Sequence, residues 1–295
     1  MAVTIIEATS LARVGATLGE GPVWVGNGAQ GALWFVDIKG PRVHRLDPAT
    51  GRLDAWDAPD HVGWVLPVPG DRFLAGLASG LHLFSPADGS FVSHHAVETD
   101  LPGNRLNDAA VDPSGRIWFG SMDNGEAAET GRLYVHDRGA VADSGAAPVV
   151  ITNGPAISPD GATLYAVDTL GRTIDAYPIG DDGRLGEPRR FLDVDPALGH
   201  PDGATCDAEG GVWVGFWGGW AARRYLPDGT LTHEVRFPVA NITKVAIGGP
   251  DGRTGYATSA RQGLDDDALA AQPQAGDVFT FDAGVTGLPV REAAL

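Results

Sequence analysis

The chain has 295 residues, and 42 glycines and 21 prolines interrupt it throughout. Both residue types destabilise helix interiors, so this composition excludes a helical bundle, while the 43% apolar content is enough for a sizeable core. A formal net charge of −17 disfavours a nucleic-acid partner and an anionic membrane surface, because both favour a basic face. The composition therefore predicts an all-β protein that is rich in loops and binds neither nucleic acid nor membrane.

The cysteine content and the N-terminal residues indicate the compartment. Cys206 is the only cysteine, so an intramolecular disulfide is excluded. Residues 1–7 do not combine a basic region with a long apolar run, and no stretch of about 18 apolar residues occurs in the sequence. We therefore expect a cytoplasmic location. Cys206 itself lies in a segment of alternating apolar residues, which favours a small core residue over a nucleophile.

One strand type with a central aromatic residue recurs six times along the chain. The aromatic residues are 39 to 48 positions apart, and they are Trp34, Phe73, Trp118, Tyr165, Trp213 and Tyr256. A second strand type follows each copy, at residues 43–46, 81–84, 133–136, 174–177, 222–225 and 278–281. Turn sequences such as Asp112-Pro-Ser-Gly115 lie between strands, where proline and glycine favour tight turns.

A period of about 45 residues with several short strands in each repeat is typical of a β-propeller. Six copies predict an all-β, six-bladed β-propeller with a central channel, and the repeats fill residues 1–295 as a single domain. A pair of β-sandwiches is the alternative architecture, but it does not explain six regular copies. We expect residues 3–7 to pair with C-terminal strands and close the ring. The tryptophans at the repeated position, Trp34, Trp118 and Trp213, are expected to pack the blades together.

The innermost strand of each blade should face the channel and precede the turn before each aromatic strand. Counting eight residues back from the turn glycines selects the equivalent positions in these strands. In chain order they hold Glu20, Val62, Asn107, Asn153, Asp202 and Lys244. Most are polar or charged, which buried strands do not tolerate without compensation. This recurrence favours a functional site in the channel over unrelated strand-end residues that bond to the backbone.

Three of these residues could bind a metal ion. Glu20, Asn153 and Asp202 offer only oxygen ligands, which suits a hard cation such as calcium, magnesium or manganese, while zinc and iron(II) stay open. One neutral and two anionic ligands leave room for water or substrate, as in a catalytic centre. His200 is interpreted as a structural neighbour of this site. Lys244 has two open interpretations, pairing with Asp202 or Glu20 and contact with the substrate.

Four stretches in different blades carry a resemblance to a known family: Leu18-Gly-Glu-Gly-Pro-Val-Trp24, Asn104-Arg-Leu-Asn-Asp108, Thr152-Asn-Gly-Pro155 and Pro201-Asp-Gly203. The sequence resembles the senescence-marker-protein/gluconolactonase family of six-bladed propellers, which includes regucalcin and bacterial sugar lactonases. The resemblance covers essentially the whole chain. Residues 216–220 and 258–261 are more similar to bacterial sugar-acid lactonases than to vertebrate regucalcin.

The resemblance implies roles for individual residues. The family's metal ligands fall on Glu20, Asn153 and Asp202. Its substrate-binding residues fall on Arg105 and Asn107. Asp202 is the candidate for activating water, and attack by a metal-bound hydroxide without it is the alternative.

A further substrate contact is expected from the stretch that follows Gly120. An acidic contact of the family falls in this region, and Asp123 is the first candidate, with Asn124 and Glu126 as alternatives. Trp217 and Trp220 are candidates for stacking on a sugar, and Trp64 and His61 for the wall of the pocket.

The resemblance implies hydrolysis of a sugar aldonolactone to its aldonic acid, with one divalent metal ion that is calcium, manganese, zinc or iron(II). A pentonolactone such as xylonolactone or arabinonolactone is the first choice of substrate, ahead of gluconolactone. The alternatives are a hydrolase of another ester or of an organophosphate, and a non-catalytic calcium-binding propeller. A monomer or weak oligomer is expected.

Overall fold

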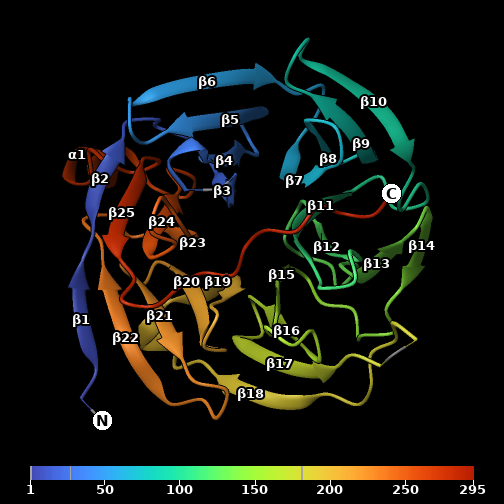
Figure 1. Cartoon of the computed structure of the whole chain (residues 1–295). Helices are drawn as coiled ribbons and strands as arrows, with labels where there is room; N and C mark the ends of the chain where they lie inside the picture. Colours follow the sequence, from blue (N-terminus) through green and yellow to red (C-terminus); the bar gives the residue numbers. More distant parts are fainter. Residues whose placement is uncertain (1, 27, 181) are drawn as a thin grey trace.

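Six β-sheets surround a central channel in the computed structural model, which describes residues 2–26, 28–180 and 182–295 (Figure 1). Met1, Asn27 and Asp181 lie outside the described residues. Each sheet is one blade, and consecutive strands run outward from the channel. This is the all-β, six-bladed β-propeller predicted from the sequence. No helix of the described ranges has the length and apolar character needed to cross a membrane.

The first three blades each contain four antiparallel strands in chain order. Blade one contains β3 (Gly19–Val25), β4 (Ala32–Asp37), β5 (Arg42–Asp47) and β6 (Arg52–Asp57). Blade two contains β7 (Val62–Val68), β8 (Arg72–Leu77), β9 (Gly80–Ser85) and β10 (Ser90–His95). Blade three contains β11 (Asn104–Val111), β12 (Ile117–Asp123), β13 (Leu133–Asp137) and β14 (Ala140–Asp143). The recurring aromatic strand is the second strand of each blade.

The remaining blades complete the ring, and two of them include an N-terminal strand. Blade four contains β15 (Thr152–Ile157), β16 (Thr163–Asp168), β17 (Thr173–Pro178) and β18 (Arg189–Asp193). Blade five contains β19 (His200–Cys206), β20 (Val212–Trp217), β21 (Ala221–Tyr225), β22 (Leu231–Arg236) and β1 (Thr4–Glu7). Blade six contains β23 (Ile242–Gly248), β24 (Thr254–Ser259), β25 (Val278–Asp282) and β2 (Thr9–Ala12). The helical segments are η1 (Gly28–Gln30), η2 (Pro196–Leu198) and α1 (Asp266–Ala271).

Two N-terminal strands close the ring, rather than the single one expected from the sequence (Figure 1). The expected segment contains β1, which pairs in parallel with β22 as a fifth strand of blade five. Closure of blade six comes from the next strand, β2, which pairs antiparallel with β25. The first and last parts of the chain are thus hydrogen-bonded in one sheet.

All six inner strands have a β-bulge at the level of the counted positions. The register with the second strand shifts between Glu20 and Val23, Val62 and Trp64, Leu106 and Ala109, Asn153 and Ala156, Pro201 and Ala204, and Ile242 and Val245. A bulge changes the direction of side chains locally and strengthens the strand twist. In blades one and four the bulge contains a glycine with positive φ, Gly21 at 55° and Gly154 at 67°, a conformation that glycine adopts readily. The bulges therefore explain why the side chains at this level of the channel point in a direction different from that expected of a regular strand.

The repeated tryptophans pack the blades, as predicted. Trp34 packs against Phe73 of blade two with ring centroids 4.2 Å apart, and Trp118 and Trp213 are fully buried. The indole Nε1 of Trp213 donates a 2.8 Å hydrogen bond to Asp207, which also accepts a 2.6 Å bond from Arg224 Nε. A buried carboxylate thus joins the second and third strands of blade five to the turn that precedes them.

Replacement of Asp207 by alanine is expected to lower the free energy of unfolding by about 3–5 kcal/mol, because it leaves the buried Arg224 guanidinium without its main counter-ion. Chemical denaturation with the slope held common to the variants measures this loss. Asp228→Ala is the control, since Asp228 lies exposed in the following turn of the same blade. Equal stability of the two variants would contradict the role of Asp207.

Candidate active site in the channel mouth

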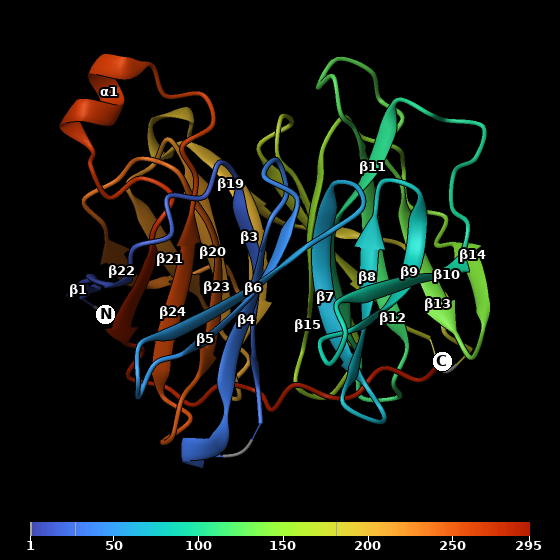
Figure 2. The same cartoon turned by 90° about the horizontal axis from the view of Figure 1, so that it is seen from above.

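A cavity of about 300 Å³ lies at one mouth of the channel, and we call it the mouth cavity. Gln262 and Gly263, which lead from β24 towards α1, contribute to its rim. Figure 2 shows α1 on one face of the ring and the C-terminal tail on the opposite face. The mouth cavity therefore opens on the α1 face.

Five of the site residues predicted from the sequence line the mouth cavity. They come from inner strands of four blades: Glu20 from β3, Arg105 and Asn107 from β11, Asn153 from β15 and Asp202 from β19. All five are 4–6% exposed. Five polar side chains from distant parts of the sequence thus converge on one cavity.

A directional chain of hydrogen bonds fixes the two amides of the site. Arg105 Nη1 donates to Asn107 Oδ1 at 2.6 Å, so the amide nitrogen of Asn107 must point the other way. That nitrogen donates to Asn153 Oδ1 at 3.1 Å and to the Thr152 carbonyl at 2.7 Å. The amide nitrogen of Asn153 in turn donates to Thr169 Oγ1 at 2.9 Å. Each amide oxygen therefore keeps one lone pair, since a carbonyl oxygen has two.

The Arg105 guanidinium donates hydrogen bonds to three acceptors, one of which is Asn107 Oδ1. Its Nε donates to Asn124 Oδ1 at 3.2 Å, and its Nη1 also donates to the Leu106 carbonyl at 3.2 Å. The N–H groups of Nη2 have no partner among the described residues, and they are available to a ligand in the cavity. Burial lowers the pKa of Arg105 to about 10, opposed by the charges of Glu20, Glu126 and Asp202, so the guanidinium stays charged at neutral pH.

Two of the carboxylates that line the cavity, Glu20 and Asp202, have strongly shifted pKa values. Burial, with the charge of Asp108, raises the pKa of Glu20 to about 8, although its carboxylate accepts a 2.7 Å hydrogen bond from the Gly21 amide. Burial and the charges of Glu20 and Asp108 raise the pKa of Asp202 well above its ordinary value. Perturbed acids in a cavity are typical of functional sites. A cation between the two buried carboxylates would stabilise their charged forms.

The donor set fits a hard divalent cation. Glu20 and Asp202 offer carboxylate oxygens, and Asn153 offers the free lone pair of its amide oxygen. No group of three histidines, cysteines, aspartates or glutamates suited to a metal ion occurs in the described part of the chain, and the third donor of this set is the Asn153 amide oxygen. Oxygen donors alone favour calcium, magnesium or manganese over softer ions.

Asp123 does not line the mouth cavity. Its carboxylate accepts hydrogen bonds of 2.9–3.0 Å from the amides of Gly125, Ala127 and Ala128, and these bonds lower its pKa. The loop that it organises places Glu126 in the cavity wall, and Asn124 against Arg105. Of the three candidates from this stretch, Glu126 is therefore the one positioned to face a substrate.

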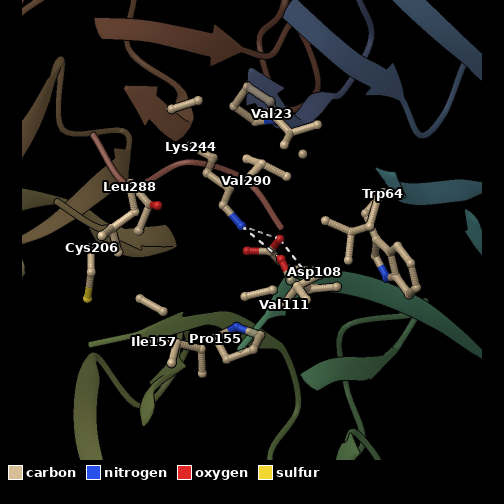
Figure 3. A pocket seen from close by; sticks show the side chains of 18 of the residues that line it. Val23, Trp64, Asp108, Val111, Pro155, Ile157, Cys206, Lys244, Leu288 and Val290 are labelled. Carbon is tan, nitrogen blue, oxygen red and sulfur yellow. Dashed lines mark hydrogen bonds and ion pairs between the residues drawn. The ribbon is translucent and has the colours of Figure 1, made fainter. Parts of the chain in front are cut away.

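Lys244 pairs with Asp108, not with Glu20 or Asp202 as one interpretation of the sequence expected. Its Nζ donates to Asp108 Oδ1 at 2.5 Å and lies 3.5 Å from the Ala109 carbonyl (Figure 3). Lys244 does not line the mouth cavity, and this position gives no support to a substrate contact.

His200 lines the mouth cavity, and both of its ring nitrogens are engaged. Arg172 Nη2 lies 2.7 Å from Nε2, and the Thr169 carbonyl lies 3.2 Å from Nδ1. Because a guanidinium only donates and a carbonyl only accepts, Nε2 is the acceptor towards Arg172 and Nδ1 the donor towards Thr169. His200 therefore has no free nitrogen for proton transfer, which agrees with a structural neighbour of the site.

The aromatic candidates separate into two groups. Trp217 lines the mouth cavity, whereas Trp220 is 46% exposed outside it. Neither Trp64 nor His61 reaches the mouth cavity, and Trp64 lies against Gly76 and Phe119 within the blades.

Cys206 is a buried free thiol, and burial raises its pKa far above the ordinary value, as expected of a core residue.

Five apolar residues also line the mouth cavity, and we call them the apolar wall; of these the sequence analysis named only Trp217. These residues come from loops and strand ends of four blades, and they are Leu18, Met122, Ile151, Leu170 and Trp217. Only the order of the loops in space brings them together, so no spacing in the sequence marks them. Leu170 is 42% exposed, which suits a surface that packs against a ligand.

Fold and site together define a six-bladed propeller with one oxygen-rich cavity at the mouth of its channel. The chain belongs to the SMP-30/gluconolactonase/LRE-like family, whose model matches residues 18–261. This confirms the resemblance seen in the sequence motifs, and the relatives include sugar lactonases.

Three similar proteins illustrate the relation. The L-arabinolactonase of Azospirillum brasilense is 37% identical over 292 residues, which are 98% of this chain and 96% of the relative. The pentonolactonase XacC of Haloferax volcanii is 33% identical over 96% of this chain and 97% of its own. The crystal structure of a calcium-binding regucalcin from Agrobacterium tumefaciens superposes with a TM-score of 0.91 and 33% identity, covering 98% of this chain and all of that one.

Proposed function

We propose that the protein hydrolyses a sugar aldonolactone to its aldonic acid, with a pentonolactone as preferred substrate and a divalent cation as cofactor. The observation that carries the proposal is the convergence of Glu20, Asn153 and Asp202 beside the free Nη2 of Arg105 in one cavity. Relatives named L-arabinolactonase and pentonolactonase support the choice of a five-carbon lactone.

The reaction adds water to the lactone carbonyl and breaks the ring C–O bond. A divalent cation held by Glu20, Asn153 and Asp202 would supply Lewis-acid polarisation of the carbonyl. Asp202 accepts the proton from the attacking water and returns it to the ring oxygen as that bond breaks, which is general base and then general acid catalysis. The product is one hydroxy acid, and no other reactant is needed.

The other residues bind and orient the substrate. Arg105 Nη2 donates to oxygens of the lactone, and the free lone pair of Asn107 Oδ1 accepts from a sugar hydroxyl. Glu126 is placed to accept from a second hydroxyl, and the apolar wall packs against the C–H groups of the ring. At about 300 Å³ the cavity lies at the small end of the range for ligand pockets, which supports a single-ring substrate.

The test is removal and return of the cation. The full chain is stripped with a chelator and assayed with xylonolactone, arabinonolactone and gluconolactone, with calcium, manganese, zinc or iron(II) added back and spontaneous hydrolysis subtracted. Turnover is expected to disappear on chelation and to return with at least one ion, with the highest kcat/KM on a pentonolactone. Full activity after complete removal of metal would reject the cation-dependent mechanism.

A second candidate function follows from the apolar wall, which suits a hydrolase of another ester or of an organophosphate. The same assay therefore includes an aryl ester and a phosphotriester. Higher kcat/KM on either of them would replace the lactone as the proposed substrate. Cation binding without turnover of any compound would favour the non-catalytic calcium-binding propeller. The cytoplasmic location and the monomeric or weakly oligomeric state stay predictions.

A further inference from the structure

Lys244 and Asp108 form a buried ion pair inside the channel, behind the mouth cavity. Both side chains line a second cavity of about 130 Å³, which we call the tail cavity because the C-terminal residues Leu288 and Val290 also line it (Figure 3). Lys244 is 6% exposed and Asp108 is 1% exposed. The activity proposed above uses neither residue, yet a buried lysine and a buried aspartate both need a reason.

The ion pair lies close to the proposed cation ligands. Asp108 directly follows Asn107, and Gly203, which directly follows Asp202, packs against the stem of Lys244. A Cβ on Gly203 would lie 2.6 Å from Lys244 Cβ, so the missing side chain makes room for the lysine. The charge of Lys244 lowers the pKa of Glu20, and that of Asp108 raises the pKa values of Glu20 and Asp202. The ammonium is thus within electrostatic reach of Glu20 as well as of Asp108.

The contacts of Lys244 show which carboxylate holds it. Asp108 Oδ1 accepts a 2.5 Å hydrogen bond from the ammonium, whose only other hydrogen-bond partner among the described residues is the Ala109 carbonyl at 3.5 Å. The second oxygen, Asp108 Oδ2, is buried without a partner in the described part of the chain. A lysine side chain is long and flexible, so without Asp108 its ammonium would turn towards the remaining carboxylates.

We propose that Asp108 is a positioning residue that keeps the Lys244 ammonium away from Glu20 and Asp202, so that both carboxylates stay available to a divalent cation. The inference rests on the proposed cation site. Asp108 and Lys244 act through the ligands and touch neither cation nor substrate.

The test measures calcium and manganese affinity of the full chain by titration calorimetry, for the wild type and three variants. Asp108→Asn keeps the shape and frees the ammonium, so it is expected to weaken the affinity by about 10–100-fold, the usual range for residues that support metal ligands. Lys244→Met removes the competing charge, and its affinity should stay at or above the wild-type value. The double variant should recover the affinity lost by Asp108→Asn.

The cation affinities of the three variants distinguish this proposal from its alternatives. Equal cation affinity of Asp108→Asn and the wild type would overturn the proposal. A double variant that binds the cation as weakly as Asp108→Asn would overturn it too, because that result is expected if the ion pair is merely structural. If Asp108→Asn does not fold in a thermal melt, Lys244→Met decides, because weakened binding by that variant contradicts competition by the ammonium. A wild-type chain that binds neither ion rejects a calcium or manganese site at these ligands, which is a different result.

Discussion

Replacement of Asp202 by asparagine is expected to lower kcat by about 10²–10⁴-fold at saturating cation, the range lost when a general base is removed. Asparagine keeps the size and one oxygen donor of the side chain, but it cannot accept a proton. Burial and the charges of Glu20 and Asp108 raise the pKa of Asp202, and a bound cation opposes this shift. The measurement is kcat on the best lactone, with cation affinity determined separately so that loss of binding is not mistaken for loss of chemistry.

Asp228→Asn is the matched control, since it makes the same chemical change at an exposed turn of blade five. Its kcat should equal that of the wild type. If Asp202→Asn keeps wild-type kcat once the cation is saturating, Asp202 is a ligand only and the proton is accepted elsewhere.

The position of the site residues along the inner strands could be predicted because the turns that follow these strands are regular. The glycines at the tight turns mark the same point in successive blades, and the bulges at Glu20, Asn153 and Asp202 occur at one distance from that point. Turn and bulge are both local features of the backbone, so their spacing is visible in the sequence. For this reason four of the six counted residues, Glu20, Asn107, Asn153 and Asp202, lie in one cavity, whereas Val62 and Lys244 do not line it.

The loops at the channel mouth could not be predicted in the same way. Asp123 and Glu126 are three residues apart, and only the folded loop shows that the first accepts backbone hydrogen bonds while the second faces the cavity. The partner of Lys244 was also open, because inner strands of several blades offer it a carboxylate at similar depth. The choice of Asp108 depends on side-chain length and on the space left by Gly203, which no spacing expresses.

The hydrogen-bond chain connects the substrate side of the site to the cation side. Arg105 sets the orientation of the Asn107 amide, and Asn107 sets that of the Asn153 amide. The lone pair that Asn153 Oδ1 offers to a cation therefore depends on the Arg105 guanidinium. Substrate binding and cation binding should therefore respond together when the chain is broken.

Replacement of Arg105 by lysine tests this connection, and kcat/KM is expected to fall about 10²-fold, the loss typical of a substrate displaced by about 1 Å. Lysine keeps the positive charge, but a single ammonium cannot bond to Asn124, to Asn107 and to a ligand in the geometry of the guanidinium. Without its donor, the Asn107 amide is free to rotate, so cation affinity should weaken as well. The control is Arg190→Lys, at an exposed ion pair on the outer strand of blade four. Unchanged kcat/KM in Arg105→Lys would show that charge alone is required, and unchanged cation affinity would show that the amides hold their orientation without the arginine.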